Sequence, residues 1–201
     1  MNFLAHLVLA GNDDGLRLGA MLGDFVRGRH ALAAYPPDVR LGIELHRHTD
    51  QFFDSLPEVA QLRRSFPALF RRYSGIVIDL AFDHELARQW NQYSAQSLEV
   101  FDREIYRLLD DNDPLLPERL RRFMSYAERR GLFASYREKS EILVSLAGIG
   151  TRFSRPNPLH RVGEIWDELQ PYFSASFEPV FLQVQSDVSS WLKSRSTTTG
   201  S

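Results

Sequence analysis

The 201-residue sequence contains no cysteine. This absence excludes a disulfide framework, a zinc site with thiolate ligands and a cysteine nucleophile, and it suits a reducing compartment. Any bound metal ion must therefore use oxygen and imidazole ligands. With 43% hydrophobic residues the chain is long enough to bury one sizeable core, so we expect a single domain over residues 1–195.

The sequence also lacks a long hydrophobic run and a strong charge imbalance. The opening segment MNFLAHLVLAG is too short to span a membrane, and it has neither a basic n-region nor a small-residue cleavage site. The formal net charge of −2 gives no global reason to expect nucleic acid or an anionic membrane as a partner. We therefore expect a cytoplasmic protein with no nucleic-acid or membrane partner. The small, polar residues 196–201 predict a disordered tail.

Strict alternation of polar and apolar residues is nearly absent, whereas apolar residues at helical spacing fill long stretches between short Pro, Gly or Asn breaks. The sequence therefore predicts an all-α, single-domain helical bundle. Ser55 followed by Glu58 is a capping-box pattern, and Asn157 before Pro158 is a second helix-start signal. The expected helices span residues 2–10, 15–33, 37–54, 57–65, 67–91, 97–111, 117–130, 134–153, 159–172 and 177–194.

Ionisable side chains occur where the helical pattern predicts burial. His6 lies in a strongly apolar segment, where a histidine is either a satisfied core residue or a ligand. Asp24 lies between apolar neighbours, and burying an unpaired carboxylate is costly. Its partner is therefore either Arg27, one turn later, or a metal ion.

Two further segments show the same anomaly. His46 and Asp50 are four residues apart and so share one helix face, where they pair with each other or converge on an ion. Asp79 and Asp83 are also four apart in an almost wholly apolar helix, and His84 follows directly. Because adjacent side chains on a helix diverge by about 100°, Asp83 and His84 can flank one site from two sides.

Repulsion among these carboxylates would be severe without a cation, and one shared metal site accounts for all of them. With carboxylate and imidazole ligands but no thiolate, the expected ions are Mn²⁺, Mg²⁺ or Fe²⁺, with Zn²⁺ possible. The predicted ligands are His6, Asp24, His46, Asp50, Asp79, Asp83 and His84.

Several of these blocks, taken in order, resemble the acyl carrier protein phosphodiesterases. The likeness is carried by MNFLAHL at the start, LGDFVRG at 22–28, GIELHR at 42–47 with Asp50, RYSGI at 72–76 with Asp79, Asp83 and His84, and the region of Gly148, Ile149 and Arg152. That family is regarded as a divergent branch of the HD-type metal phosphohydrolases. The resemblance implies an HD-like helical fold, Mn²⁺ as the favoured metal, and hydrolysis of the phosphodiester that joins 4'-phosphopantetheine to a serine of acyl carrier protein.

The chain departs from these patterns at two places. The adjacent pair of ordinary HD proteins runs His then Asp, whereas Asp83 and His84 run in the opposite order. Val8 stands where the usual opening of the family has a second histidine, which favours His6 as the functional one.

Hydrolysis of a phosphodiester requires charge neutralisation, a hydroxide and help for the departing alkoxide. We expect Asp79 to orient or deprotonate the water, and His46 or His48 to protonate the leaving oxygen. Arg27 or Arg47 is expected to bind the nonbridging oxygens, with an ordinary helix salt bridge as the alternative for each. The predicted catalytic residues are Asp24, Arg27, His46, Arg47 and Asp79.

Arginine clusters make the local charge uneven, at residues 63–64, 71–72, 119–122 and 129–130. They suggest an acidic partner such as acyl carrier protein, and a solvated helix face is the alternative for any single cluster. Two other functions remain open, an HD-type hydrolase of nucleotides or alarmones and a non-enzymatic helical interaction module. The nucleotide alternative lacks a glycine-rich phosphate loop or a base-reading motif in the sequence.

Overall fold

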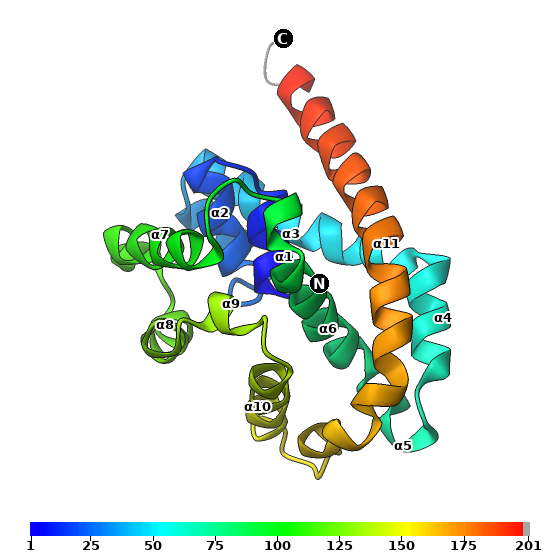
Figure 1. The fold of residues 1–201 in the computed structure, drawn as a ribbon. Helices are drawn as coiled ribbons and strands as arrows, with labels where there is room; N and C mark the ends of the chain where they lie inside the picture. The colour runs from blue at the N-terminus through cyan, green and yellow to red at the C-terminus, as the bar shows by residue number, and fades with distance from the viewer. Residues whose placement is uncertain (199–201) are drawn as a thin grey trace.

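A computed structural model describes residues 1–198, without the side chains of residues 196–198. This part of the chain is helical and contains no strand, which confirms the all-α prediction (Figure 1). The α-helices are α1 (Phe3–Leu9), α2 (Asp14–Leu22), α3 (Pro37–Ser55), α4 (Pro57–Ser65), α5 (Ala68–Arg71), α6 (Ser74–Arg88), α7 (Leu98–Asp111), α8 (Glu118–Arg130), α9 (Leu132–Ser135), α10 (Lys139–Gly150) and α11 (Gly163–Thr198). The short 3₁₀ helices are η1 (His30–Ala34), η2 (Trp90–Gln92), η3 (Asp113–Leu115) and η4 (Leu159–Arg161).

Several predicted boundaries are wrong. The helix expected over 15–33 ends at Leu22, and the chain then passes through Gly28, whose φ of 79° favours glycine. The stretches 67–91 and 134–153 each divide into two helices, α5 with α6 and α9 with α10. The predicted capping box at Ser55 does not form, because α3 continues through Ser55 and its hydroxyl donates to the Phe52 carbonyl.

Two helices were expected over 159–172 and 177–194. The structure instead has the short η4 followed by the single long helix α11, although Pro171 and Pro179 lie inside it. An interior proline removes a backbone hydrogen bond and costs roughly 3 kcal/mol. The buried rings of Phe173, Phe177 and Phe181, spaced four residues apart, pack into the core along this stretch and offset that cost. The predicted tail starts within α11, and residues 199–201 lie outside the described residues.

Helix α6 lies at the centre of the molecule, between α1 and α11 in Figure 1. It contacts α1, α4, α10 and α11, and nearly every residue from Val77 to Ala87 is buried. The Phe82 ring meets Phe53 of α3 and Phe177 of α11 edge to face. A helix that is buried all round has no polar face, so the carboxylates of α6 must find partners inside the protein.

Helices α2 and α3 approach each other closely at two glycines. A Cβ atom on Gly19 would lie 2.5 Å from the Gly42 Cα, and a Cβ on Gly42 would lie 2.6 Å from the Leu16 carbonyl oxygen. No larger residue fits at either position without a shift of the backbone. This contact places the end of α2 beside the middle of α3, where Asp24 and His46 meet.

Over residues 1–198, no helix has the combination of length and apolar character that crossing a membrane requires.

Candidate metal centre

Two imidazoles and one carboxylate converge between α1 and α3. His6 comes from α1, and His46 and Asp50 share one face of α3, as their spacing predicts. The His6 Nε2 lies 3.0 Å from Asp50 Oδ1, and the His46 Nε2 lies 3.3 Å from Asp50 Oδ2. One ligand atom from each residue lies within 4.8 Å of the others. We call these three residues the His/Asp cluster.

The two rings of the cluster stack on each other, and that of His46 is also held from behind. They stack with their centroids 3.8 Å apart, and the His46 Nδ1 lies 2.9 Å from the Ala20 carbonyl oxygen. An Nδ1–H that donates to a carbonyl directs Nε2 into the cluster, which is the arrangement typical of metal-ligating histidines. Gly23 leaves the room that the ring needs, because a Cβ there would lie 2.2 Å from the His46 Cγ.

Two more predicted carboxylates border the cluster. Asp24 Oδ1 lies 3.5 Å from the His46 Nε2, and 60% of the Asp24 side chain is exposed. Asp79 of α6 is linked through the ammonium group of Met1, which lies 3.3 Å from Asp79 Oδ1 and 2.9 Å from Asp50 Oδ1. Asp24 therefore lies on the solvent side of the cluster and Asp79 on the side of the core helix.

The charges in this region shift several pKa values. Burial, together with the charge of the adjacent His46, lowers the pKa of His6 to about 4. Burial also disfavours a charged His46, but the Asp24 and Asp50 carboxylates outweigh this and raise its pKa to about 9. Although burial opposes ionisation of Asp50, hydrogen bonds from both histidines hold its pKa well below its usual range. At neutral pH the Asp50 carboxylate is therefore ionised and lies among groups that supply positive charge.

A divalent cation fits this donor set. Two imidazole nitrogens and ionised carboxylate oxygens are ligands of Mn²⁺, Fe²⁺ and Zn²⁺, and the carboxylates alone suit Mg²⁺. The cluster is therefore a possible His/Asp metal-binding site.

Asp83 lies outside the cluster, unlike the sequence prediction. Its carboxylate is fully buried, and it accepts hydrogen bonds from the backbone N–H groups of Leu4 (2.9 Å) and Ala5 (3.0 Å) and from the Asn2 side chain (3.0 Å). Helix α1 has no side-chain cap of its own at Asn2, so Asp83 caps it from α6. Burial raises the pKa of Asp83 to about 7 despite these hydrogen bonds.

His84 and His48 also face away from the cluster. The His84 Nδ1 lies 2.7 Å from the Tyr136 carbonyl oxygen, and its ring meets the edge of Trp166. The His48 Nε2 lies 2.6 Å from Asp187 of α11, on another face of α3. The structure therefore does not bring either imidazole to the carboxylates that border the cluster.

The two predicted phosphate-binding arginines follow Asp24 and His46 in the sequence. The Arg47 guanidinium donates to the Val26 carbonyl at 2.6 Å and so fixes the segment that follows Asp24. Arg27 is exposed on the same segment.

An aromatic surface extends from Asp24 toward a cavity. The rings of Phe3, Phe25 and Phe123 lie with centroids 5.1 to 6.5 Å apart, and we call them the aromatic trio. Beyond it a cavity of about 290 Å³ opens between the start of α1, α8 and α10. We call this space the α8–α10 cavity. The Arg119 guanidinium lies over the Phe25 ring at 6.0 Å.

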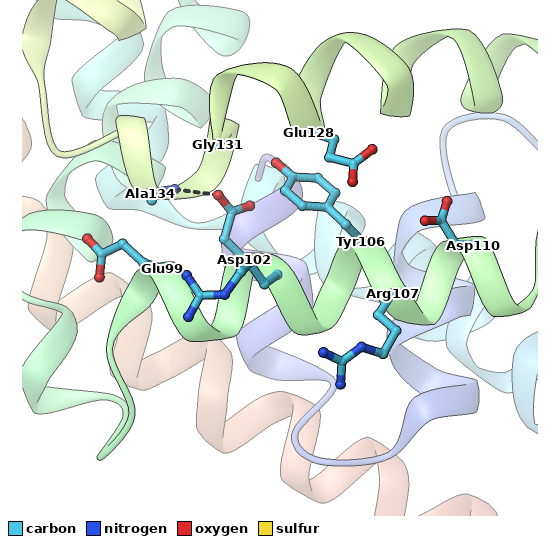
Figure 2. Close-up of a pocket in the computed structure, with 9 residues that line it drawn as sticks. Glu99, Asp102, Tyr106, Arg107, Asp110, Glu128, Gly131 and Ala134 are labelled. Carbon is cyan, nitrogen blue, oxygen red and sulfur yellow. Dashed lines mark hydrogen bonds between the residues drawn. The ribbon is translucent and has the colours of Figure 1, made fainter.

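A larger cavity of about 510 Å³ lies along α7, toward α8 and α9 (Figure 2). Four carboxylates line it, those of Glu99, Asp102, Asp110 and Glu128. The Asp102 carboxylate accepts a hydrogen bond from the Ala134 N–H at 3.4 Å. None of its lining residues belongs to the His/Asp cluster or to the aromatic trio.

The comparison with known families agrees with the resemblance read from the sequence. A family model described as acyl carrier protein phosphodiesterase matches residues 1–184. The chain belongs to this family. A protein of Pectobacterium atrosepticum with the same description is 37% identical over 184 residues, covering 91% of this chain and 93% of that protein. Proteins of that description from Escherichia coli O6:H1 and O157:H7 are 34% identical over 180 residues, covering 87% of this chain and 89% of each relative. No solved structure matches the chain.

Two residues that position His46, Ala20 and Gly23, were not predicted from the sequence. The Ala20 carbonyl orients His46 through the backbone, which any residue would provide. Gly23 acts by having no side chain, and its position directly before Asp24 was the one available hint.

Proposed function

We propose that this chain hydrolyses the phosphodiester of holo acyl carrier protein, releasing 4'-phosphopantetheine and apo acyl carrier protein. The observation that supports this most strongly is the convergence of His6, His46 and Asp50 in a member of this family. Mn²⁺ is the ion we expect, with Mg²⁺ or Fe²⁺ as the other candidates. A cytoplasmic location and an HD-like ancestry remain predictions.

The cluster residues are the proposed ligands of the metal ion. A bound divalent cation supplies a Lewis acid for the phosphoryl oxygens and lowers the pKa of a bound water. His6 and His46 contribute imidazole nitrogens, and Asp50 contributes both carboxylate oxygens toward the two rings. Asp79 and Asp24 border this set on either side of it, next to the proposed ligands.

Asp24 is the carboxylate best placed to orient the attacking water. It is exposed, it lies beside His46, and the segment that carries it is fixed by the hydrogen bond from Arg47. Asp79 is instead half-buried against the Met1 ammonium, so we assign it a role in positioning Asp50 from the core side. His48 is paired with Asp187 and is not assigned the proton for the leaving serine oxygen.

Of the predicted arginine clusters, the one on α8 is placed beside this site by Arg119. Arg119 is exposed, and its guanidinium covers the Phe25 ring directly after Asp24. The clusters at 63–64 and 71–72 lie on α4 and at the end of α5, on the other side of α6 from α8 in Figure 1. Acyl carrier proteins are strongly acidic, so we propose that they dock on α8 by electrostatic complementarity.

The decisive experiment incubates holo acyl carrier protein with the purified chain and Mn²⁺ and follows the carrier protein by mass spectrometry. The expected product is the apo form, and chelation of the metal is expected to prevent its formation. Hydrolysis of a nucleotide or an alarmone without apo product would favour the alternative phosphohydrolase. A stable chain that binds no metal and hydrolyses neither substrate would favour the interaction module.

A further inference from the structure

We propose that the α8–α10 cavity binds the pantetheine chain of the substrate while its phosphodiester lies at the His/Asp cluster. This inference rests on the proposed function, and it assigns a second subsite that the cluster does not include. Three features of the cavity support it. The start of α1 contacts both the cavity and the cluster, the size and lining residues of the cavity suit pantetheine, and the larger cavity along α7 has a less suitable charge.

The start of α1 lies between the cavity and the cluster and contacts both. Asn2 and Phe3 line the cavity, and the preceding residue, Met1, contacts the cluster through its ammonium on Asp50 and its carbonyl on His6. The Phe3 ring packs on Phe25 with centroids 6.3 Å apart, and Phe25 directly follows Asp24. A chain attached to a phosphate beside Asp24 therefore reaches the cavity across the aromatic trio.

The size and composition of the cavity suit pantetheine. Its volume of about 290 Å³ is near the lower end of the roughly 300–1,000 Å³ found for small-molecule sites. Phe3, Phe123, Leu132 and Ile149 provide apolar walls, while Tyr136, Ser145 and Thr151 are the hydroxyl-bearing residues that line it. Pantetheine is an uncharged chain of dimethyl and methylene groups interrupted by a hydroxyl and two amides, so it needs this mixture of apolar contacts and a few polar partners.

One wall of the cavity is held rigidly. The Asn2 side chain donates to the buried Asp83 carboxylate at 3.0 Å and lies 3.4 Å from the Tyr136 hydroxyl. Tyr136 is itself buried, with 3% of its surface exposed. A site whose polar groups are fixed in advance loses less entropy when the ligand binds.

The larger cavity in Figure 2 does not suit the same ligand. Its four carboxylates outnumber the guanidinium groups of Arg103 and Arg107, so its net negative charge disfavours the phosphate end of the substrate, and it has no lining residue in common with the start of α1. The α8–α10 cavity contains no carboxylate among its lining residues, and Arg152 lies at its edge.

A larger side chain introduced at Gly148 of α10 would fill part of the cavity. Ser145, Gly148 and Ile149 share one face of α10, because residues three and four apart on a helix are neighbours, and all three line the cavity. A Cβ on Gly148 would meet no atom within 4 Å. Gly148→Leu therefore places a side chain in the cavity without a clash at its base. Val144, which is 44% exposed on α10 and does not line the cavity, provides Val144→Leu as the matched control.

The test measures binding of pantetheine to the whole chain by NMR titration and, separately, turnover of holo acyl carrier protein. Gly148→Leu is expected to weaken pantetheine binding and to raise the KM for holo acyl carrier protein by about tenfold or more, because the leucine occupies the ligand space. Val144→Leu is expected to leave both within about twofold, and circular dichroism melting confirms that each variant is folded.

The outcomes separate this inference from the proposed function. Wild-type affinity and KM in Gly148→Leu would overturn the cavity assignment, even if the wild type converts holo acyl carrier protein to the apo form. Resonance shifts that map to the α7 cavity would also overturn it. Pantetheine binding that Gly148→Leu weakens, in a chain that forms no apo product, would support the cavity and contradict the proposed function alone.

Discussion

Replacing Gly23 with alanine tests the candidate metal centre without removing any predicted ligand. The new Cβ would lie 2.2 Å from Cγ, 2.4 Å from Cδ2 and 2.6 Å from Nδ1 of His46, whereas ordinary contact begins at 3.4 Å. The backbone at Gly23 has φ −50° and ψ −43°, which alanine adopts without strain. Any destabilisation by the substitution must therefore come from the collision with the imidazole ring, because alanine at a compatible position otherwise stabilises the fold by restricting the unfolded chain.

The structure sets the size of the expected effect. The ring and the methyl group must separate by more than 1 Å, which breaks the hydrogen bond from the His46 Nδ1 to the Ala20 carbonyl. Overpacking of this kind costs about 1–3 kcal/mol of folding free energy. Loss of the hydrogen bond that orients a metal-binding histidine typically lowers metal affinity by about 10–100-fold. We expect both effects in Gly23→Ala.

A double-mutant cycle identifies the collision as the cause. The free energy of unfolding of the metal-free chain is measured by urea denaturation for Gly23→Ala, His46→Ala and the double variant, and Mn²⁺ affinity is measured by calorimetry. The cost of Gly23→Ala is expected to disappear, or to become a small gain in stability, once the His46 ring is absent. Gly148→Ala is the control, because its Cβ meets nothing. An equal cost in both backgrounds, or wild-type Mn²⁺ affinity in Gly23→Ala, would refute the reasoning.

Three further predictions address the ligands, the docking surface and the buried carboxylate. Asp50→Asn removes the charge that both imidazoles contact, so metal content measured by mass spectrometry is expected to fall below stoichiometry, whereas Asp187→Asn on α11 is expected to retain the metal. Arg119→Glu is expected to raise the KM for holo acyl carrier protein, most strongly at low ionic strength, while Arg64→Glu on α4 leaves it unchanged. The same change of KM in both variants would contradict docking on α8. The pKa of Asp83 is raised from 3.8 to about 7 in the folded chain, so the folded state binds the extra proton between these values. The wild type is therefore expected to gain stability relative to Asp83→Asn as the pH falls from about 7 to about 4, and parallel urea midpoints over this range would contradict it.

The fold class and part of the site were predictable because their signals are local. Apolar residues at helical spacing determine which face of a helix is buried, so the all-α prediction is confirmed without knowledge of the tertiary structure. The spacing of His46 and Asp50 fixes their relation on α3 for the same reason. That His6 joins them depends on the packing of α1 against its neighbours, and only its apolar surroundings and the family-like opening of the sequence indicated it.

The positions of Asp83 and His84 were not predictable from their spacing. A buried carboxylate is satisfied equally well by a metal ion or by backbone N–H groups, and the sequence does not reveal that α1 lacks a side-chain cap at Asn2. Adjacent residues on a helix point in different directions, so the burial of Asp83 against α1 directs His84 toward Tyr136. The helix boundaries failed for a related reason, because the packing of Phe177 and its neighbours outweighs the two prolines inside α11.

The proposed substrate requires a site for the phosphodiester, a docking surface for the carrier protein and a subsite for the pantetheine chain. One face of α8 contributes to the last two. The scissile phosphodiester joins the carrier protein to the pantetheine chain, so the carrier protein must dock beside the His/Asp cluster while the chain extends away from it into a subsite of its own. Arg119, Phe123 and Tyr126 lie at i, i+4 and i+7 on α8 and therefore share one face. Arg119 covers Phe25 beside Asp24, while Phe123 and Tyr126 line the cavity. A rotation or displacement of α8 would consequently disturb docking and chain binding together, whereas the cluster on α1 and α3 would keep its ligands.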